Sequence, residues 1–564
     1  MHHPAPPFDL DTLIIGAGPA GLQLGYYLEK AGRRYLVVER SDKVGSFFRR
    51  FPRSRGLISF NKTRSIYRDP EINLRWDWNS LLTDDYSHPF GDFSRDFYPH
   101  AGDMVRYLES FHRTHNIQVR FGFTVTRIAR EGVGYRVTDA DGNTLSCRCL
   151  VVATGMGRPH IPDIPGIEHA EGYEEVSFKA DDYLDQRVLI IGKGNSGFEL
   201  AERILSTAAI IHIASPQPIR MAWKTRHPGH LRAQYTSLLD AYQLKTLHSA
   251  LDCDILDIRR LEDGKLLVTV RYTHADGEVD EIVYDRVVRA TGFCFDGRLF
   301  DPDCRPQTIV DGRLPDMSPV WESRQSPNLF FAGTLMQARD FRQSSSAFID
   351  GFRYNVRSLF HVLEERYFAV PAPGRTLALD PAKVAHHILQ RVCRASSLWT
   401  QFGYLSDTLV VDRQRQAITY REDVPVAVVG EGLEAEAEVY TVTLEWGRWE
   451  GDVFAIDRHP HHDRADASVF LHPIVRRYHH GGLVAEVHLL EDLLGVYGSG
   501  FETGMIRSHN RTEIEQYHRE QHDAPLLAWL TAHLGEPARA SMRVDALPAQ
   551  LAAAGPSQPV PPLV

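Results

Sequence analysis

Two glycine motifs of identical spacing carry the clearest chemical signal in this chain. The first is Gly16-x-Gly18-x-x-Gly21, between an apolar strand and an amphipathic helix, and Glu39 closes the next apolar strand. Gly16 allows a tight turn, Gly18 lets backbone amides approach a pyrophosphate, and Gly21 lets the helix N-terminus lie close to the sheet. Glu39 can accept hydrogen bonds from the ribose of an unphosphorylated adenosine. The motif and its acid therefore predict a dinucleotide site of the FAD type.

The second motif predicts a nucleotide site of a different kind. It also follows an apolar strand, but the next strand ends at Ser215 without an acid. Arg220 is the cation nearest that strand end, and cations there would attract a 2′-phosphate. The pattern favours NADPH over NADH, although Arg220, Lys224 and Arg226 also suit a solvated loop. The motif residues expected to contact NADPH are Gly192, Gly194, Asn195, Ser196 and Gly197.

Three further strands end in glycine turns, at Thr154-Gly155, Gly292 and Gly333. Ligands of open α/β sheets bind outside these carboxyl ends. We assign Thr154, Gly155 and Gly333 to the FAD side, together with Val125. Gly292 is a cofactor contact or only a domain connection.

The order of these elements predicts the fold class. Two βαβ units, each followed by an Asp-Gly hairpin and a strand ending in Ala-Thr-Gly, indicate an internal duplication. The apolar strand before Gly333 returns after the second unit, as is needed if one domain is inserted in the other. We therefore expect an α/β protein with two Rossmann-like domains and a C-terminal α+β region. The expected ranges are 8–165 with 325–367 for FAD, 166–324 for NADPH, 368–545 for an accessory domain and 546–564 for a disordered tail.

Composition excludes several other classes. The chain has 564 residues, of which 43% are hydrophobic, and a net charge of −10, opposite to the basic face of a nucleic-acid binder. No run of about 18 apolar residues predicts a membrane span. Six cysteines are too few for a disulfide scaffold, and Cys147 and Cys149 lack the C-x-x-C spacing of a dithiol oxidant. These features predict a cytoplasmic protein without nucleic-acid or membrane partners.

Several longer segments resemble a known family. The paired glycine motifs, the form GKGNSG and the sequence ATGF resemble class B flavin-dependent monooxygenases. FNKTRSIYRDPEINLRWDWNSLL, RMAWKTRHPGHLRAQ and FFAGTLMQARDFRQSSSAFIDGFRYNVRSL look more closely like the FAD-dependent oxidoreductase domain-containing proteins, relatives of an endoplasmic reticulum flavoprotein associated with degradation. The resemblance covers about residues 8–480. The chain lacks a signal peptide and a retention tetrapeptide, so the lumenal role is not expected here.

The resemblance implies a reaction. NADPH would reduce FAD, oxygen would add at flavin C4a, and the hydroperoxide would pass one oxygen atom to a soft nucleophile such as an amine. One stretch departs from the monooxygenase pattern F-x-G-x-x-x-H: around Gly172, Ala170 and Val176 stand where Phe and His would fall. N-hydroxylating relatives relax the same stretch. We expect Phe48 to cover the flavin, and Asn61, Asn79 and Ser80 to bond flavin or peroxide as catalytic residues, although ordinary loop structure explains each of them equally well.

Arginines near this loop suggest the substrate. Arg53, Arg339 and Arg342 could bind a carboxylate through their guanidinium forks. We therefore expect an amine or amino acid, together with O2, as substrates, and N-hydroxylation as the reaction; surface arginines or pyrophosphate contacts are the alternative. Reduction without oxygen transfer and a non-catalytic flavoprotein remain further alternatives. The His-rich stretch at 459–480 has irregular spacing and is read as a loop, so no metal is expected. The C-terminal region covers the flavin domain or forms a homodimer contact.

Overall fold

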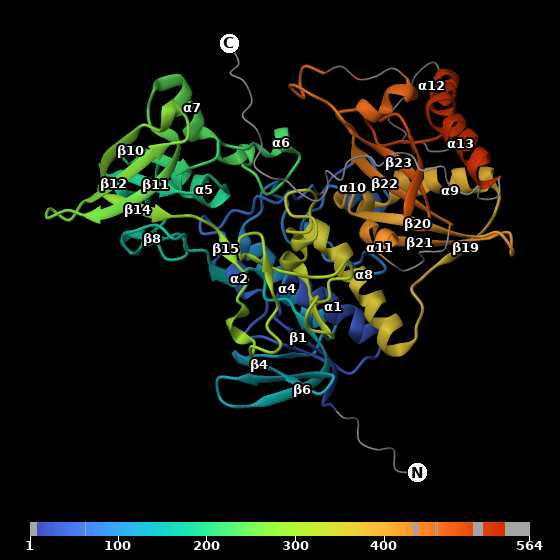
Figure 1. Ribbon diagram of the computed structural model, residues 1–564, viewed down its shortest axis with the longest axis horizontal. Helices are drawn as coiled ribbons and strands as arrows, with labels where there is room; N and C mark the ends of the chain where they lie inside the picture. Colours follow the sequence, from blue (N-terminus) through green and yellow to red (C-terminus); the bar gives the residue numbers. More distant parts are fainter. Residues whose placement is uncertain are drawn as a thin grey trace.

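The protein folds around three sheets (Figure 1). The computed structural model describes residues 8–62, 64–431, 438–456, 458, 461–499 and 511–535. The two glycine motifs belong to the first and second sheets, and the third sheet belongs to the C-terminal region. The expected tail at 546–564 lies outside the described residues.

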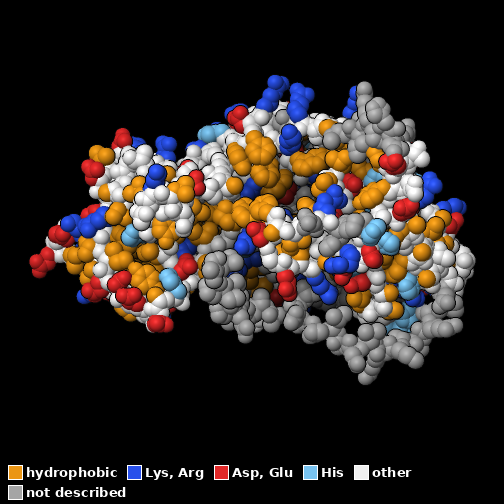
Figure 2. All heavy atoms as spheres, turned by 90° about the horizontal axis from the view of Figure 1, so that it is seen from above, with side chains coloured by type: hydrophobic (Ala, Val, Ile, Leu, Met, Phe, Trp, Pro, Cys, Tyr) orange, Lys and Arg blue, Asp and Glu red, His pale blue; other side chains and the backbone are white. Residues whose placement is uncertain are grey.

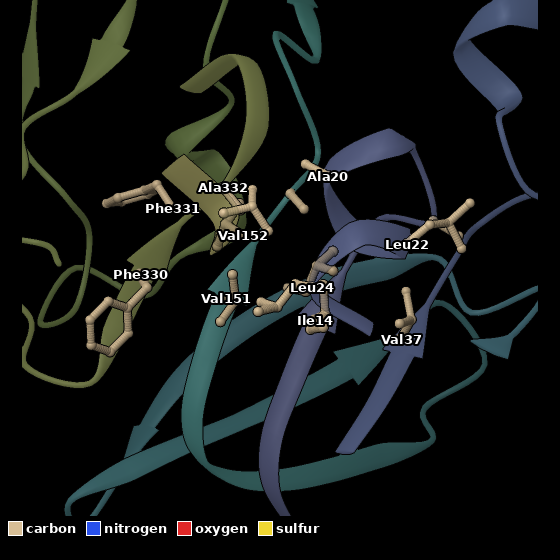
Figure 3. Packing of buried hydrophobic residues seen from close by; sticks show 14 of the residues in the cluster. Ile14, Ala20, Leu22, Leu24, Val37, Val151, Val152, Phe330, Phe331 and Ala332 are labelled. Atoms are coloured by element: carbon tan, nitrogen blue, oxygen red, sulfur yellow. The ribbon is translucent and has the colours of Figure 1, made fainter. Parts of the chain in front are cut away.

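The first sheet has the strand order β3-β2-β1-β6-β5-β4, and the late strand β18 pairs with β6. Strands β1, β2, β6 and β18 run parallel. Between β1 and β2, helix α1 carries the chain back to the other end of the sheet, as a parallel pair requires. Leu24 of α1 lies beside Ile14 and Val151 in the core (Figure 3). The elements are β1 (Leu10–Ile15), α1 (Pro19–Lys30), β2 (Tyr35–Val38), α2 (Ser46–Arg50), α3 (Pro70–Asn73), α4 (Ala101–Thr114), β3 (Val119–Arg120), β4 (Val125–Glu131), β5 (Gly134–Asp139), β6 (Thr144–Val152) and β18 (Leu329–Phe331).

The second sheet has the order β13-β12-β11-β10-β9-β14-β8 and repeats the plan of the first. Helix α5 joins the parallel strands β9 and β10, as α1 joins β1 and β2. This repetition confirms the predicted pair of Rossmann-like folds. The elements are β8 (Glu171–Gly172), β9 (Arg187–Ile191), α5 (Asn195–Ile204), β10 (Ile210–Ser215), α6 (Ala222–Thr225), α7 (Ser237–Lys245), β11 (Ser249–Arg260), β12 (Leu266–Tyr272), β13 (Val279–Tyr284) and β14 (Arg286–Arg289).

Two short antiparallel strands, β7 (Arg158–Pro159) and β15 (Phe293–Cys294), connect the two folds. After β15 the chain returns to the first core, where Phe295, Met317 and Trp321 are buried. Strand β18 then completes the first sheet, so the second fold is an insertion in the first. The expected domain boundaries themselves stay predictions.

The C-terminal region has its own antiparallel sheet, β19-β21-β20-β22-β23-β24, and its own core. Helices α9 and α13 contact one another beside this sheet (Figure 1). These elements confirm the predicted α+β region. They are β19 (Arg375–Ala378), α9 (Pro381–Arg394), α10 (Ser396–Thr400), β20 (Leu405–Asp412), β21 (Ala417–Pro425), α11 (Val426–Glu431), β22 (Glu438–Trp446), β23 (Leu471–His479), β24 (Gly482–His488), α12 (Arg511–His518) and α13 (Ala524–Leu534).

On the face seen in Figure 2, basic and acidic side chains are interspersed over much of the described surface. None of the helices in the described ranges is long and apolar enough to cross a membrane. No group of three or more His, Cys, Asp or Glu side chains in those ranges is arranged to hold a metal ion.

The C-terminal region is fastened to the first fold by buried hydrogen bonds. Gln401 is fully buried, accepts a hydrogen bond from the Ser345 backbone N–H at 3.1 Å, and donates to Ser346 Oγ at 2.9 Å and to Asn355 Oδ1 at 2.7 Å. Asn355 lies on α8 (Ile349–Phe368), the long helix that follows β18. Of the two roles considered for this region, the contacts support a cover for the flavin domain, and a homodimer stays a prediction.

We expect Gln401→Leu to lower the free energy of unfolding by about 2–4 kcal/mol, because it leaves buried donors and acceptors of the neighbouring loop unpaired. Chemical denaturation measures this. The matched change Gln390→Leu, on the exposed face of α9, should cost less than about 0.5 kcal/mol. Equal effects of the two changes would contradict the fastening role of Gln401.

A second prediction concerns Asp340, which is buried near this contact and accepts hydrogen bonds from Ser344 and Ser346. Burial raises the pKa of its carboxyl to about 6 from 3.8, despite these hydrogen bonds. The folded-state pKa lies above the unfolded value, so this contribution to stability is present at low pH and is lost as the pH rises through about 6. As the pH falls from about 7 to about 4.5, the free energy of unfolding of the wild type should rise by about 2 kcal/mol relative to that of Asp340→Asn in denaturation experiments. A pH-independent difference would refute this account.

Candidate functional site

The first glycine turn is tightly packed at two of its three glycines and open at the third. Gly16 has a φ of +108°, and a Cβ there would lie 2.7 Å from the Ala153 carbonyl oxygen. A Cβ on Gly21 would lie 1.9 Å from the Gly16 carbonyl oxygen. A Cβ on Gly18 would meet nothing within 4 Å. The space above Gly18 is thus where a pyrophosphate can approach the N-terminus of α1.

The second glycine turn repeats this geometry. Gly192 has a φ of +119°, and a Cβ there would lie 2.4 Å from the Ala290 carbonyl oxygen. A Cβ on Gly197 would lie 2.3 Å from the Gly192 carbonyl oxygen, and Gly194 is open in the same way as Gly18. The two turns are therefore equivalent cradles for two dinucleotides.

Glu39 is fixed beside the first turn. Its carboxylate accepts hydrogen bonds from the backbone N–H of Ala17 at 2.9 Å, from that of Ser41 at 3.0 Å and from Ser46 Oγ at 3.1 Å. A carboxylate has about four lone-pair sites, so one remains for a ribose hydroxyl. The residue fits the role that the sequence predicts for it.

The other residues predicted for FAD gather around the same edge. Gly155 and Gly333 follow β6 and β18, and a Cβ on Gly333 would lie 2.7 Å from Ala20 Cβ at the start of α1. Thr154 precedes Gly155. Val125 opens β4, two residues after Phe123, whose N–H donates to the Glu39 carbonyl oxygen at 3.0 Å. The tertiary structure thus brings together residues that are more than 300 positions apart in the chain.

Phe48 and Arg53 belong to a segment that joins the two folds. Phe48 lies on α2 and packs against the first core. The Arg53 guanidinium donates to the Val176 carbonyl oxygen at 2.7 Å, and Phe51 stacks on Tyr173 with ring centroids 6.0 Å apart. Because one nitrogen of the Arg53 guanidinium already donates to this backbone carbonyl, the contact does not support the expected substrate role, which stays a prediction.

In the second site, the Asn195 side chain hydrogen-bonds to the backbone of a neighbouring loop. Its side chain donates to the Gly229 and His230 carbonyl oxygens at 3.2 and 2.9 Å and accepts from the Arg232 backbone N–H at 3.0 Å. These bonds fix the loop at 226–232 against the second turn. Ser196 and Gly292 both line a small pocket beside this turn.

Gly292 and Ser215 also make structural bonds. The Gly292 carbonyl oxygen accepts from the His160 N–H at 2.9 Å, which supports its reading as a domain connection. Ser215 ends β10, and its carbonyl oxygen accepts from Lys193 Nζ at 3.2 Å. Both residues border the second turn, so a cofactor contact stays a prediction for each.

Only part of the expected basic loop is available to NADPH. The Arg226 guanidinium donates to the Val469 carbonyl oxygen at 3.0 Å and lies 5.9 Å from the rings of Trp446 and Trp449. The C-terminal region therefore holds Arg226, while Arg220 is exposed beyond the end of β10. This contact also anchors the loop that carries Arg220.

The two other arginines predicted for substrate lie after β18. Arg339 Nη1 donates to the Met317 carbonyl oxygen at 3.2 Å. Burial lowers the pKa of Arg342, and the positive charges of Arg220 and Arg313 lower it further. The structure thus places Arg342 near Arg220, the cation that the sequence predicts for NADPH, in a region that attracts anions. Substrate binding by either arginine stays a prediction.

Asn61, Asn79 and Ser80 are buried and hydrogen-bonded within the protein. Asn61 Nδ2 donates to the carbonyl oxygens of Ser94 at 2.8 Å and Asp96 at 3.1 Å. Asn79 Nδ2 donates to the Phe60 carbonyl oxygen at 3.0 Å, and Ser80 Oγ donates to Asp77. These bonds shape the loop, so the catalytic roles expected for the three residues stay predictions.

The sequence reasoning missed three buried charges near this loop: Arg232, Asp350 and Arg353. Arg353 is fully buried and donates to the carbonyl oxygens of Asp77 at 3.0 Å, Ser80 at 2.8 Å and Leu74 at 2.7 Å. For Asp350 and Arg353 the available signal was a charged residue on the apolar face of the helix at 348–367, and helical spacing alone does not say that a charge is buried. Arg232 lies in a loop and gave no such signal.

All six cysteines are buried and unpaired. Burial raises the pKa of Cys149 to about 12, and it also raises the pKa of Cys147. A reactive dithiol needs accessible thiols of low pKa. The cysteines of this chain therefore do not support dithiol chemistry.

The first turn yields a matched pair of predictions. Gly18→Ala should leave the thermal stability of the FAD-free protein unchanged and weaken FAD binding at least about tenfold, because the new methyl group occupies the pyrophosphate space. Gly21→Ala should instead lower the melting temperature, since its Cβ collides with the Gly16 carbonyl. Flavin absorbance per chain after dialysis and a melting curve measure both. Full FAD retention by Gly18→Ala would contradict the cradle.

Arg220→Gln should raise the KM for NADPH about tenfold and leave the KM for NADH unchanged, because it removes a cation expected at the 2′-phosphate. Steady-state oxidation of both nucleotides measures the ratio. Lys265→Gln, an exposed change on β12's hairpin, is the control and should alter neither value. A parallel loss with both nucleotides would point to misfolding instead.

Comparison with known proteins agrees with this geometry. The family model described as pyridine nucleotide-disulphide oxidoreductase matches residues 13–333. FAD-dependent oxidoreductase domain-containing protein 2 of Mus musculus is 37% identical over 508 residues, 83% of this chain and 76% of that protein. Probable indole-3-pyruvate monooxygenase YUCCA1 of Arabidopsis thaliana is 30% identical over 217 residues, 36% of this chain and 45% of that protein.

One solved structure shares the fold. A flavin-containing monooxygenase from Stenotrophomonas maltophilia has a TM-score of 0.50 and 19% identity, over 63% of this chain and 98% of its own. Both glycine turns fit the cofactors that the sequence predicts, FAD and NADPH, which are typical of this class. The protein is a flavin-dependent oxidoreductase, and the chain belongs to the family of FAD-dependent oxidoreductase domain-containing proteins.

Proposed function

We propose that the protein is an NADPH-dependent flavin monooxygenase that N-oxygenates a small amine or amino acid. The observation that carries this proposal is the pairing of two open nucleotide cradles with six buried, unpaired cysteines. Electrons from NADPH can pass to FAD, but no thiol pair of the chain is placed to receive them from FAD. Molecular oxygen is then the acceptor that needs no further protein group.

When bound, FAD supplies the hydride acceptance and oxygen chemistry. The chain's residues bind and shield it. Gly18 and Glu39 hold FAD at the first turn, and Gly194 and Arg220 hold NADPH at the second. The segment with Phe51, stacked on Tyr173, closes the junction between the two folds, which keeps water away from the reacting groups.

Names of similar proteins support the oxygen-transfer part of the proposal. YUCCA1, which resembles part of this chain, is named as a monooxygenase, whereas the protein from Stenotrophomonas maltophilia contributes only the likeness of its fold. The choice of nitrogen as the oxygenated atom rests on the relaxed stretch around Gly172, where Ala170 and Val176 stand in place of Phe and His. A cytoplasmic location suits the unpaired thiols and stays a prediction.

Isotope labelling tests the proposal. The FAD-loaded protein is incubated with NADPH, ¹⁸O2 and amino acids or small amines supplied singly, and products are analysed by mass spectrometry. We expect one ¹⁸O atom per product and one NADPH consumed per oxygen transferred. NADPH oxidation that yields only hydrogen peroxide with every compound would favour a reductase or oxidase. Absence of NADPH oxidation would favour a non-catalytic flavoprotein.

A further inference from the structure

Two buried charges of opposite sign near the N-terminus of α8 each have an atom without a hydrogen-bond partner. Asp350, in the first turn of α8, is 1% exposed, and its Oδ1 makes no hydrogen bond. Arg232, on the loop behind the second glycine turn, is 6% exposed, and its Nη1 makes none. Buried polar groups are almost always paired, so each of these atoms requires an explanation.

The two charges influence each other electrostatically but form no direct contact. The charge of Arg232 lowers the pKa of Asp350, and the charge of Asp350 raises that of Arg232, in each case against the larger effect of burial. Within the described part of the chain they form no ion pair of 4.0 Å or less. Arg353, the other cation near Asp350, already donates to three backbone carbonyls. We call the space between Asp350 Oδ1 and Arg232 Nη1 the gap, because neither of these buried atoms has a hydrogen-bond partner there.

The gap lies where the two cofactor sites meet. The Arg232 backbone N–H donates to Asn195 of the second turn at 3.0 Å. Its guanidinium lies over the rings of Phe60 at 4.4 Å and Trp78 at 5.0 Å, next to the loop that carries Asn61 and Asn79. Aromatic faces hold the guanidinium plane in place and leave its edge for hydrogen bonds. A ligand in the gap would thus be at the junction of the NADPH and FAD sites.

The chemistry of the gap selects its occupant. The ligand must offer an acceptor to the guanidinium and a donor to the carboxylate, and it must keep the site neutral overall. An amine alone leaves Arg232 unpaired, and a carboxylic acid alone leaves Asp350 unpaired, each at the cost of a buried charge. The zwitterion of an α-amino acid satisfies both with its carboxylate and its ammonium group.

We propose that Arg232 and Asp350 form the binding site for the α-carboxylate and the α-amino group of an amino-acid substrate. This inference rests on the proposed function and narrows its substrate class. It also replaces two of the three arginines expected from the sequence, since Arg53 and Arg339 donate to backbone carbonyls. Burial raises the pKa of Asp350 to about 7, and an ammonium group beside it would favour its charged form.

Binding to the FAD-loaded protein tests the site without turnover. The probes are the twenty proteinogenic L-amino acids, each with its decarboxylated amine and its 2-hydroxy acid, titrated anaerobically by calorimetry. At least one amino acid should bind the wild type at least about tenfold more tightly than both analogues. This comparison needs no variant. Failure of every amino acid to bind, or equal binding of an analogue, would overturn the proposal.

Two conservative variants should each weaken the binding of a different analogue, which we call a crossed pattern of affinities. Asp350→Asn should weaken the amino acid and the amine and leave the hydroxy acid unchanged; Arg232→Gln should weaken the amino acid and the hydroxy acid and leave the amine unchanged. Arg298→Gln and Asp280→Asn, exposed changes of the same chemistry, should leave all affinities unchanged. The substrate site would be refuted if both variants lost affinity for the same ligands. It would also be refuted if either variant lost FAD or lost NADPH-driven FAD reduction, because the two charges would then serve the cofactors.

Turnover with ¹⁸O2 separates this inference from the proposed function. A crossed binding pattern without labelled product would retain the site and refute the monooxygenase. Labelled product formed by both variants with wild-type kinetics would retain the monooxygenase and refute the site.

Discussion

The close approach of helix α1 to strand β1, and of α5 to β9, is the constraint on which the rest of the structure depends. At both turns a methyl group on the third glycine would lie within 2.3 Å of a carbonyl oxygen. Only this proximity points the N-terminal amides of the helix at the space above the middle glycine. The parallel pairing of β1 with β2 and of β9 with β10, and the places expected for both cofactors, depend on these two contacts.

Buried polar groups join the three regions around these cradles. Arg353 fastens α8 to the loop at 74–80, Gln401 fastens the C-terminal region to α8, and Asn195 fastens the loop at 226–232 to the second turn. Each such contact specifies one arrangement, because a displaced partner would leave a buried group unpaired. The site is therefore assembled from all three regions, and the C-terminal region is part of it through Arg226.

The same burial explains why several residues singled out in the sequence have structural tasks. Asn61, Asn79 and Ser80 have polar side chains in a loop, which suited them to a reacting group, but their atoms bond to neighbouring backbone and to Asp77. Arg53 bonds to Val176 in the same way. A linear sequence shows that a polar group is present; the partner it meets depends on segments far away in the chain.

The sequence by itself determined the two dinucleotide folds, their order, the inserted topology and the cofactor types. It could do so because strand, turn, helix and acid follow each other within about 25 residues, so local sterics and periodicity suffice. Only the tertiary structure decided which charged residues are buried at the junction of the two nucleotide-binding folds. Arg232 and Asp350 are 118 positions apart, and no local pattern distinguishes a cation or an acid that is buried and unpaired from one that faces water. That difference depends on long-range packing, which brings the second turn and the start of α8 against the loop at 60–80.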